Sequence, residues 1–272
     1  MLDRTRIILV RPQHSGNIGA AARAMQNMGL NDLVVVDPPS YDPETARWLA
    51  PGCSDMVASV RVVPTVLAAL EGIQVCVATT ARHRKQLQPV TTPSELARRI
   101  ATEPARFAIL FGREDFGLST EDSLHAESLL RIPTPEHASL NLGQAVLLVS
   151  YALFEEARTH GPVATGRTLG GTTHTSTRRK SKPDRRQGPA GMEQLEPVVE
   201  EAIQILERVG YFRSTPPTKV RLTLRQTLQR AKPNFRHTEA FRGMLSRIRW
   251  ALENPEADPR AVRFENPNNT KR

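Results

Sequence analysis

The first 157 residues alternate short apolar runs with stretches of helical character. Five runs have the length and composition of buried strands: residues 6–11, 32–37, 74–79, 106–112 and 128–133. Helical periodicity separates them at residues 17–28, 93–101, 121–127 and 141–160, and residues 61–70 predict a strand end that runs into a helix. Strands that alternate with helices along the chain indicate an α/β fold with a mainly parallel sheet.

The pattern changes after residue 160. Gly, Thr, Ser, Pro and basic residues dominate the next thirty residues, and this composition predicts a flexible linker. Helical periodicity then returns, with Arg interleaved among Leu, Met and Ile. We therefore expect an α/β domain, a basic linker, a small all-α extension and a polar tail, at residues 1–160, 161–191, 192–253 and 254–272.

Charge divides the chain near the same place. Residues 1–157 hold 14 Lys and Arg against 17 Asp and Glu, a net charge of −3, whereas residues 158–272 hold 23 against 11, a net charge of +12. A near-neutral body joined to a strongly basic extension predicts contact with a polyanion. The same balance also occurs as a plain solubility feature.

Composition argues against a membrane, secreted, disulfide-rich or metal-binding protein. Hydrophobic residues make up 39% and charged residues 24% of the chain, which suits an ordinary folded core. No apolar run reaches the roughly 18 residues of a membrane helix and no leader follows Met1, so we expect neither membrane insertion nor secretion. The two cysteines, Cys53 and Cys76, exclude a disulfide framework and fit a reducing cytoplasm. Seven scattered histidines show no metal-ligand spacing, so we expect no metal site.

The first motif is the run Ser-Gly-Asn-Ile-Gly-Ala-Ala-Ala-Arg at residues 15–23. Small residues at a helix start let a phosphate or a backbone approach closely, and Ser15 or Asn17 is the expected N-cap. Arg23 is four residues after Gly19, on the same helix face, and is suited to hold an anion or to contact a hydroxyl. A closely packed Ala/Gly helix with a solvated Arg is the alternative.

The second motif, Phe-Gly-Arg-Glu-Asp-Phe-Gly-Leu-Ser at residues 111–119, follows a predicted buried strand. Gly112 and Gly117 favour a sharp loop around a ligand, and Arg113 beside Glu114 offers both signs of charge. The run lacks the Gly-Lys-Ser/Thr of a nucleotide triphosphatase loop and the G-x-G-x-x-G of a dinucleotide fold. The alternative is an ordinary strand-to-helix loop, with Ser119 or Thr120 capping the helix that contains Glu121.

The third motif joins Ile132-Pro133 to the run Ser-Leu-Asn-Leu-Gly-Gln-Ala at residues 139–145. Ser139 is a plausible N-cap of the long helix, which would be a purely structural role. Ser139 and Asn141 would equally present a hydroxyl and an amide to a substrate at a helix start.

Together, in this order and spacing, the three motifs resemble the TrmH-like branch of the SPOUT-class RNA 2′-O-ribose methyltransferases. The resemblance implies a parallel sheet with a C-terminal trefoil knot, and a homodimer that binds S-adenosyl-L-methionine. The opening run at residues 6–30, followed by a helical extension, is most similar to bacterial members that act on the anticodon stem-loop of tRNA, at the ribose of the cytidine or uridine at position 32. Action on ribosomal RNA, or a non-catalytic RNA-binding role, stays open.

The resemblance also implies roles for individual residues. Asn17 and Arg23 would lie on the substrate side, with Arg23 activating the 2′-hydroxyl near the partner subunit's cofactor. The site would be organised by Glu114, Ser139 and Asn141. The cofactor would be held by Thr79, Thr80, Ala81, Arg82, Leu110, Phe111, Gly112, Arg113, Glu114, Ile132, Pro133, Ser139, Leu140, Leu142 and Ala145.

Basic residues of the extension are frequent enough to follow a phosphate backbone. We expect RNA contacts from these residues and from two arginines of the first domain: Lys219, Arg221, Arg225, Arg230 and Lys232, with Arg23 and Arg84. Tyr211, Phe212 and Phe235 lie among them and fit either base stacking or the core of a helical bundle.

Overall fold

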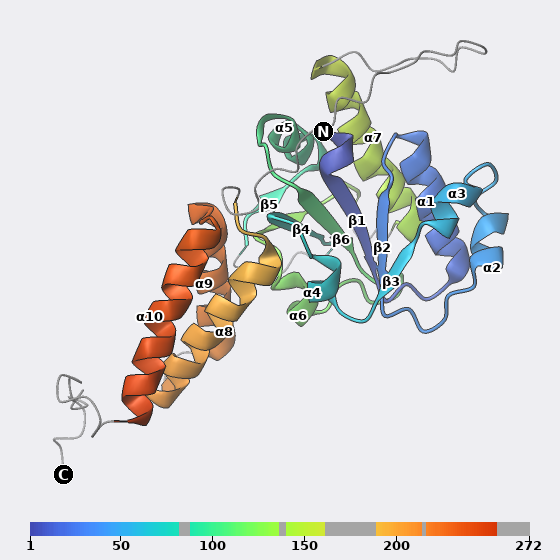
Figure 1. Cartoon of the computed structure of the whole chain (residues 1–272). Helices are drawn as coiled ribbons and strands as arrows, with labels where there is room; N and C mark the ends of the chain where they lie inside the picture. The colour runs from blue at the N-terminus through green and yellow to red at the C-terminus, as the bar shows by residue number, and fades with distance from the viewer. Residues whose placement is uncertain (82–87, 136–139, 161–188, 214–215, 255–272) are drawn as a thin grey trace, which may run out of the picture. The chain divides into compact units, whose positions relative to one another are not determined.

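The computed structural model describes residues 1–81, 88–135, 140–160, 189–213 and 216–254. The chain divides into two compact units, an α/β unit that holds every element up to residue 160 and a helical unit (Figure 1). Among the described residues after 188, residues 191–193 belong to the first unit, and residues 189–190 and 194–254 belong to the second. Most of the predicted linker and nearly all of the predicted tail lie outside the described residues.

The α/β unit is built on one sheet of seven strands within the described residues, and every pair is parallel. The strand order is β3-β2-β1-β6-β4-β7-β5. The strands are β1 (Thr5–Val10), β2 (Asp32–Val36), β3 (Arg61–Val63), β4 (Val75–Thr79), β5 (Val90–Thr91), β6 (Phe107–Phe111) and β7 (Ser128–Leu130). The predicted α/β fold with a parallel sheet is confirmed.

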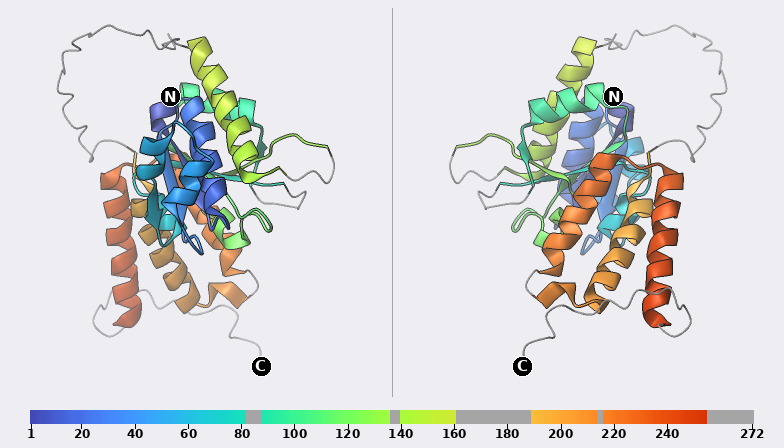
Figure 2. Two further views of the ribbon diagram at one scale, coloured as in Figure 1. Left: turned by 90° about the vertical axis from the view of Figure 1, so that its right-hand side faces the viewer. Right: turned by 90° about the vertical axis from the view of Figure 1, so that its left-hand side faces the viewer.

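Helices follow the strands in alternation, and a short 3-10 helix, η1 (Leu2–Arg4), precedes β1. The α-helices of the first unit are α1 (Ser15–Asn27), α2 (Pro43–Trp48), α3 (Ser54–Ala58), α4 (Val66–Ala69), α5 (Pro93–Thr102), α6 (Thr120–Ser123) and α7 (Leu142–His160). One face of the sheet packs through alternate strand residues against α1, α5 and α7, because successive side chains of a strand point to opposite faces. Figure 2, left, looks onto this layer of helices.

Three short elements carry no periodicity in the sequence and were not predicted: α2, α3 and β5. Each spans six residues or fewer, too short for a repeating apolar pattern. A capping signal does mark α2, because the Asp42 carboxylate accepts hydrogen bonds from two backbone amides and Pro43 occupies the first turn.

Helix ends differ from the predictions in two places. The N-cap of α1 is His14, not Ser15 or Asn17, because the Ser15 hydroxyl accepts a hydrogen bond from the backbone amide of Asp42. Helix α6 spans four residues rather than the predicted 121–127. Residues 82 and 136–139, which belong to the loops implied for the trefoil knot, lie outside the described residues, and the knot stays a prediction.

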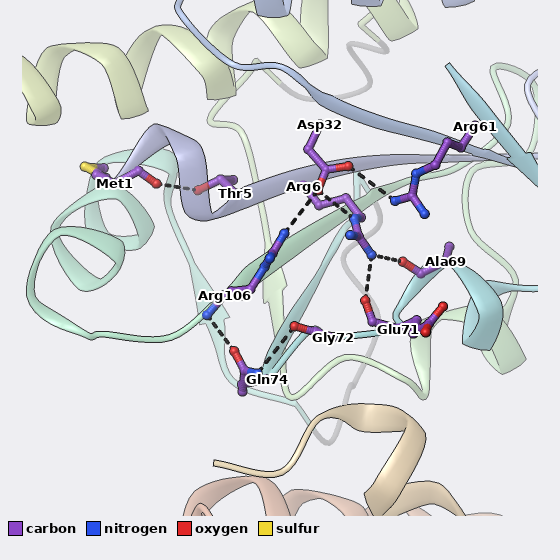
Figure 3. Close-up of polar contacts among 10 residues, drawn as sticks. All are labelled: Met1, Thr5, Arg6, Asp32, Arg61, Ala69, Glu71, Gly72, Gln74 and Arg106. Atoms are coloured by element: carbon purple, nitrogen blue, oxygen red, sulfur yellow. Dashed lines mark hydrogen bonds and ion pairs between the residues drawn. The ribbon is translucent and has the colours of Figure 1, made fainter. Parts of the chain in front are cut away.

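The amino-terminal edge of the sheet is held by a buried arginine (Figure 3). Arg6, only 7% exposed, donates to the Asp32 carboxylate at 2.9 Å and to the carbonyls of Ala69 and Glu71 at 2.8 and 2.9 Å. Its charge therefore meets both a carboxylate and the carboxyl end of α4, where cations are favoured. Arg61 approaches the same carboxylate at 3.4 Å but is half exposed.

Replacing Arg6 by Met should lower the free energy of unfolding by about 3 kcal/mol, because two carbonyls and much of the Asp32 charge lose their partner. Urea titration of the full chain measures the change. The matched control is Arg61→Met, which removes an exposed ion pair of the same carboxylate and should cost less than about 1 kcal/mol. Equal costs for the two variants would contradict the anchoring role of Arg6.

The second unit is a small all-α domain, as predicted from the fold pattern. Its elements are α8 (Met192–Arg208), the 3-10 helix η2 (Tyr211–Arg213), α9 (Pro217–Ala231) and α10 (Phe235–Glu253). Helix α8 buries Leu195, Val199 and Ile203 on one face. The polar side of α8 carries carboxylates that pair with arginines of α9 and α10.

Candidate active site

Strand register brings the predicted cofactor segments to one edge of the sheet. Strand β4 lies between β6 and β7, with Ala78 paired to Leu110 and Thr79 paired to Leu130. The segments that follow these three strands therefore begin side by side, at the carboxyl edge where open α/β sheets bind ligands. The Thr79 hydroxyl fixes two of them together by donating to the carbonyl of Leu110 at 2.9 Å.

Glu114 joins the first two motifs. Its carboxylate accepts from the Asn17 side-chain amide at 2.7 Å and from the backbone amide of Gln13 at 2.9 Å. Both bonds are charge-assisted, so they are stronger than bonds between neutral groups. The loop after β6 is thereby tied to the start of α1.

Asn141 adds the third motif to the same network. Its side-chain amide donates to the Asn17 oxygen at 3.2 Å, while its own oxygen accepts from the backbone amide of Gly143 at 2.9 Å. The Gln144 side chain accepts from the backbone amide of Asn141 at 3.2 Å, which completes a reciprocal cap. Asn141, and not the predicted Ser139, caps α7; Ser139 itself lies outside the described residues.

The second motif forms a tight turn closed by its two glycines. The backbones of Arg113 and Gly117 exchange two hydrogen bonds, at 3.2 and 2.8 Å. A side chain on Gly112 would lie 2.1 Å from the Gly117 carbonyl carbon, and Gly117 has a φ of 73°. Glycine is therefore needed at both positions.

Arg113 and Glu114, the neighbouring charged residues of this turn, bind different partners. Arg113 forms two hydrogen bonds with the Asp115 carboxylate, at 3.0 and 2.8 Å. This pair raises the pKa of the Arg113 guanidinium and lowers the pKa of the Asp115 carboxyl, in both cases chiefly through the side-chain hydrogen bonds. Because Arg113 is paired with Asp115, the Glu114 carboxylate bonds to Asn17 rather than to Arg113.

An ion pair between Arg11 and Asp122 was not predicted from the sequence. Arg11, directly after β1, pairs with the carboxylate of Asp122. Asp122 also accepts from Ser119, and Ser119 caps α6 as predicted. The available signal was a charged residue placed at the carboxyl end of a buried strand.

The remaining cofactor residues divide by exposure. Leu110, Phe111 and Leu142 are buried, and Pro133 and Ala81 are exposed. The others in the described part are half-buried: Thr79, Thr80, Gly112, Arg113, Ile132, Leu140 and Ala145. Arg82 and Arg84 lie outside the described residues.

Arg23 is not brought to this network. It lies six residues after Asn17 on α1, which turns its side chain about 120° away from that of Asn17 at 100° per residue. It is exposed, and no hydrogen bond or ion pair joins it to another described residue.

One predicted RNA contact in the helical unit is contradicted. Arg225 is 2% exposed, and its guanidinium donates to the Glu196 carboxylate at 2.9 Å, so it is not available to a phosphate. Arg221 is also committed in part, through ion pairs with Glu200 and Glu196. The pairing lowers the pKa of Glu200, mainly through its hydrogen bond with Arg221. Lys219, Arg230 and Lys232 are exposed.

Within the described residues, no group of three or more His, Cys, Asp or Glu side chains could hold a metal ion. None of the helices in this part of the chain has the length and apolar character needed to cross a membrane.

Comparison with known proteins places this site in a family. Residues 4–151 match the SpoU rRNA Methylase family. A tRNA (cytidine/uridine-2′-O-)-methyltransferase TrmJ from Pectobacterium atrosepticum is 33% identical over 91% of this chain and 98% of its own length, and the Photorhabdus laumondii protein of that name is 34% identical over 92% and 99%. The crystal structure of TrmJ from Z. mobilis superposes with a TM-score of 0.71 at 34% identity, over 90% of this chain and 99% of that one. The resemblance predicted from the three motifs is confirmed, and the chain belongs to the SpoU family of RNA methyltransferases.

Proposed function

We propose that the protein is an S-adenosyl-L-methionine-dependent tRNA methyltransferase that modifies the ribose 2′-oxygen of the cytidine or uridine at anticodon-loop position 32. The observation that carries the proposal is the extent of the likeness. Relatives named for tRNA 2′-O-methylation match this chain over nearly their whole length, helical unit included. The three-motif resemblance supplies the position in the anticodon loop. We also propose a cytoplasmic location, which fits a tRNA substrate.

The residues at the sheet edge fit S-adenosyl-L-methionine. Buried Leu110 and Leu142 and half-buried Ile132 would offer apolar contacts to an adenosine, and the backbones of the loops would supply its hydrogen-bond partners. Glu114 supplies a carboxylate at the same edge, which suits a positively charged sulfonium. When bound, the cofactor supplies an electrophilic methyl group, so no metal is required.

The protein's own task is to prepare the 2′-hydroxyl, a poor nucleophile near neutral pH. Its proton has to leave as the new C–O bond forms. Arginine side chains are poor bases, so we assign the departing proton to a neighbouring RNA phosphate or to water rather than to Arg23. The role we assign to Arg23 is to lower the pKa of the hydroxyl and to align the oxygen for in-line attack. Asn17, held by Glu114, accepts from Asn141, and this chain of hydrogen bonds would keep the segments of the three motifs in place around the substrate.

Exposed apolar side chains support the implied homodimer. They gather on two helices that both pack against α1 (Figure 2, left): Trp48 and Leu49 on or next to α2, and Leu147, Leu148 and Tyr151 on α7. Exposed groups of this kind mark protein interfaces. Pairing through this layer would bury Arg23 against the partner and explains why Arg23 turns away from Asn17 of its own chain.

Methylation of a defined transcript tests the function. Purified protein, S-adenosyl-L-methionine and an unmodified tRNA should yield a single 2′-O-methyl group at position 32, mapped by mass spectrometry after nuclease digestion. A tRNA with a 2′-deoxyribose at position 32 is the matched control and should stay unmodified. Methylation at another position, or of a ribosomal RNA fragment alone, would overturn the assignment.

A further inference from the structure

Arg11 has a backbone conformation that arginine rarely adopts. It follows β1 directly, and its φ of 49° lies in the left-handed region. Side chains other than that of glycine crowd the backbone there, and the usual exceptions are Asn and Asp, whose short polar side chains bond locally. An arginine in this conformation is strained, and such strain persists where the surrounding contacts hold it in place.

The end of the neighbouring strand has the same backbone with a more usual residue. Asp37 follows β2 with a φ of 43°, and its backbone amide donates to the carbonyl of Val63 at 2.9 Å. The backbone amide of Arg11 donates in the same way to the carbonyl of Val36, at 2.8 Å. Asp37 follows the general preference for this region and Arg11 does not, so the sheet alone does not explain an arginine at residue 11.

The Arg11 side chain binds the far end of the second motif. Its guanidinium pairs with the carboxylate of Asp122, which is only 7% exposed. That carboxylate also accepts from the backbone amide of Ser119 at 3.3 Å, and the Ser119 hydroxyl accepts from the backbone amide of Asp122 at 3.0 Å. The pair is charge-assisted and partly buried, so it is stronger than an ion pair on the surface. Arg11 therefore fixes the start of α6, directly after the turn of residues 112–117.

The same short segment also binds the turn itself. The backbone amide of Gln13 donates to the Glu114 carboxylate at 2.9 Å, and the Gln13 side chain donates to the carbonyl of Arg11 at 3.0 Å. Residues 11–13 thus hold the turn of residues 112–117 at two points, through Glu114 within it and through Asp122 after it. This turn contains three of the residues that the family resemblance assigns to the cofactor.

We propose that Arg11 is a positioning residue for methyl transfer, which sets the place of the turn at residues 112–117 relative to the start of α1. The inference rests on the proposed function, because the turn is then part of the cofactor site. Arg11 acts through Asp122 and does not touch the reacting atoms. The pair orders the turn in advance, which reduces the entropy lost when the cofactor binds.

Replacement by glycine separates positioning from stability. Arg11→Gly relieves the backbone strain as it removes the guanidinium, so the thermal midpoint of unfolding should change little. The affinity for S-adenosyl-L-methionine, measured by calorimetry on the full chain without RNA, should fall by about 10-fold, because the ligand then has to order the turn. Arg11→Lys should restore most of this affinity, since an ammonium group can still pair with Asp122.

The matched control is Asp37→Gly, which relieves the same backbone conformation at the neighbouring strand and should leave the affinity unchanged. Asp122→Asn keeps an acceptor for Ser119 but removes the charge, and should weaken binding as much as Arg11→Gly does. The double variant Arg11→Gly/Asp122→Asn should bind no more weakly than either single variant, because both substitutions act through one ion pair.

Hydrogen exchange measures the order of the turn without the cofactor. Backbone amides of residues 112–117 should exchange about 10-fold faster in Arg11→Gly than in the parent protein, while those of β1 keep their protection. Parental exchange and parental affinity in Arg11→Gly would overturn the inference, as would additive losses in the double variant. Faster exchange of the turn in a protein that methylates no tRNA would overturn only the proposed function.

Discussion

Arg23→Ala should lower the rate of methyl transfer by about 10²- to 10³-fold while leaving the affinity for S-adenosyl-L-methionine nearly unchanged. The reason is its place in the fold. Arg23 lies on α1 away from the Glu114–Asn17–Asn141 network, so its loss disturbs none of those bonds. Single-turnover assays measure the rate and calorimetry measures cofactor binding. Arg98→Ala, an exposed arginine on α5, is the matched control and should keep full activity.

Mixing subunits tests whether Arg23 serves the partner's site. Arg23→Ala and Glu114→Ala proteins, each nearly inactive alone, should regain about a quarter of parental activity when unfolded together and refolded, because mixed two-fold dimers then contain one intact site. If Arg23 acts within its own chain, each mixed dimer carries two defective sites and no activity returns.

Glu114→Ala should reduce methylation by about 10²-fold, because the Asn17 side chain and the loop at Gln13 lose the group that positions them. Glu114→Gln keeps the size and one acceptor oxygen and should lose less. The control is Glu121→Ala, an exposed carboxylate on α6.

A thermal melt of the same proteins separates positioning from stability. Without Glu114, the Asn17 side-chain amide and the Gln13 backbone amide lose their acceptor. We expect the free energy of unfolding to fall by about 1–3 kcal/mol, which leaves most of the protein folded at the assay temperature. A fully folded Glu114→Ala protein with parental activity would show that the network does not organise the site.

Much of the α/β unit followed from short-range pattern. Apolar runs of strand length, separated by helical periodicity, predicted the strands β1, β2, β4, β6 and β7 to within a few residues and the parallel sheet that contains them. The short elements α2, α3 and β5 escaped because a period needs length to be recognised. The resemblance grouped Asn17, Glu114 and Asn141 with Arg23 and Ser139. The structure joins the first three by hydrogen bonds and leaves Arg23 outside this network, and Ser139 lies outside the described residues.

Partner choice among charged side chains did not follow from the sequence. Arg113 and Glu114 are neighbours in the chain, yet one pairs with Asp115 and the other with Asn17. Arg225 and Arg230 lie on the same basic helix and could not be told apart in the sequence. Arg225 is buried because its guanidinium pairs with Glu196 on another helix. An ion pair depends on distances of a few ångströms between segments far apart in sequence.

Local order of apolar and polar residues was thus enough to predict most strands and the long helices, because backbone geometry repeats over a few residues, and the resemblance of three short motifs to a known family supplied the methyltransferase assignment. Long-range packing settled which motif residues meet, which cations stay at the surface and where Arg23 points. Those outcomes depend on how α1, α7 and the turn at residues 112–117 are brought together at one edge of the sheet, and no local pattern encodes that placement.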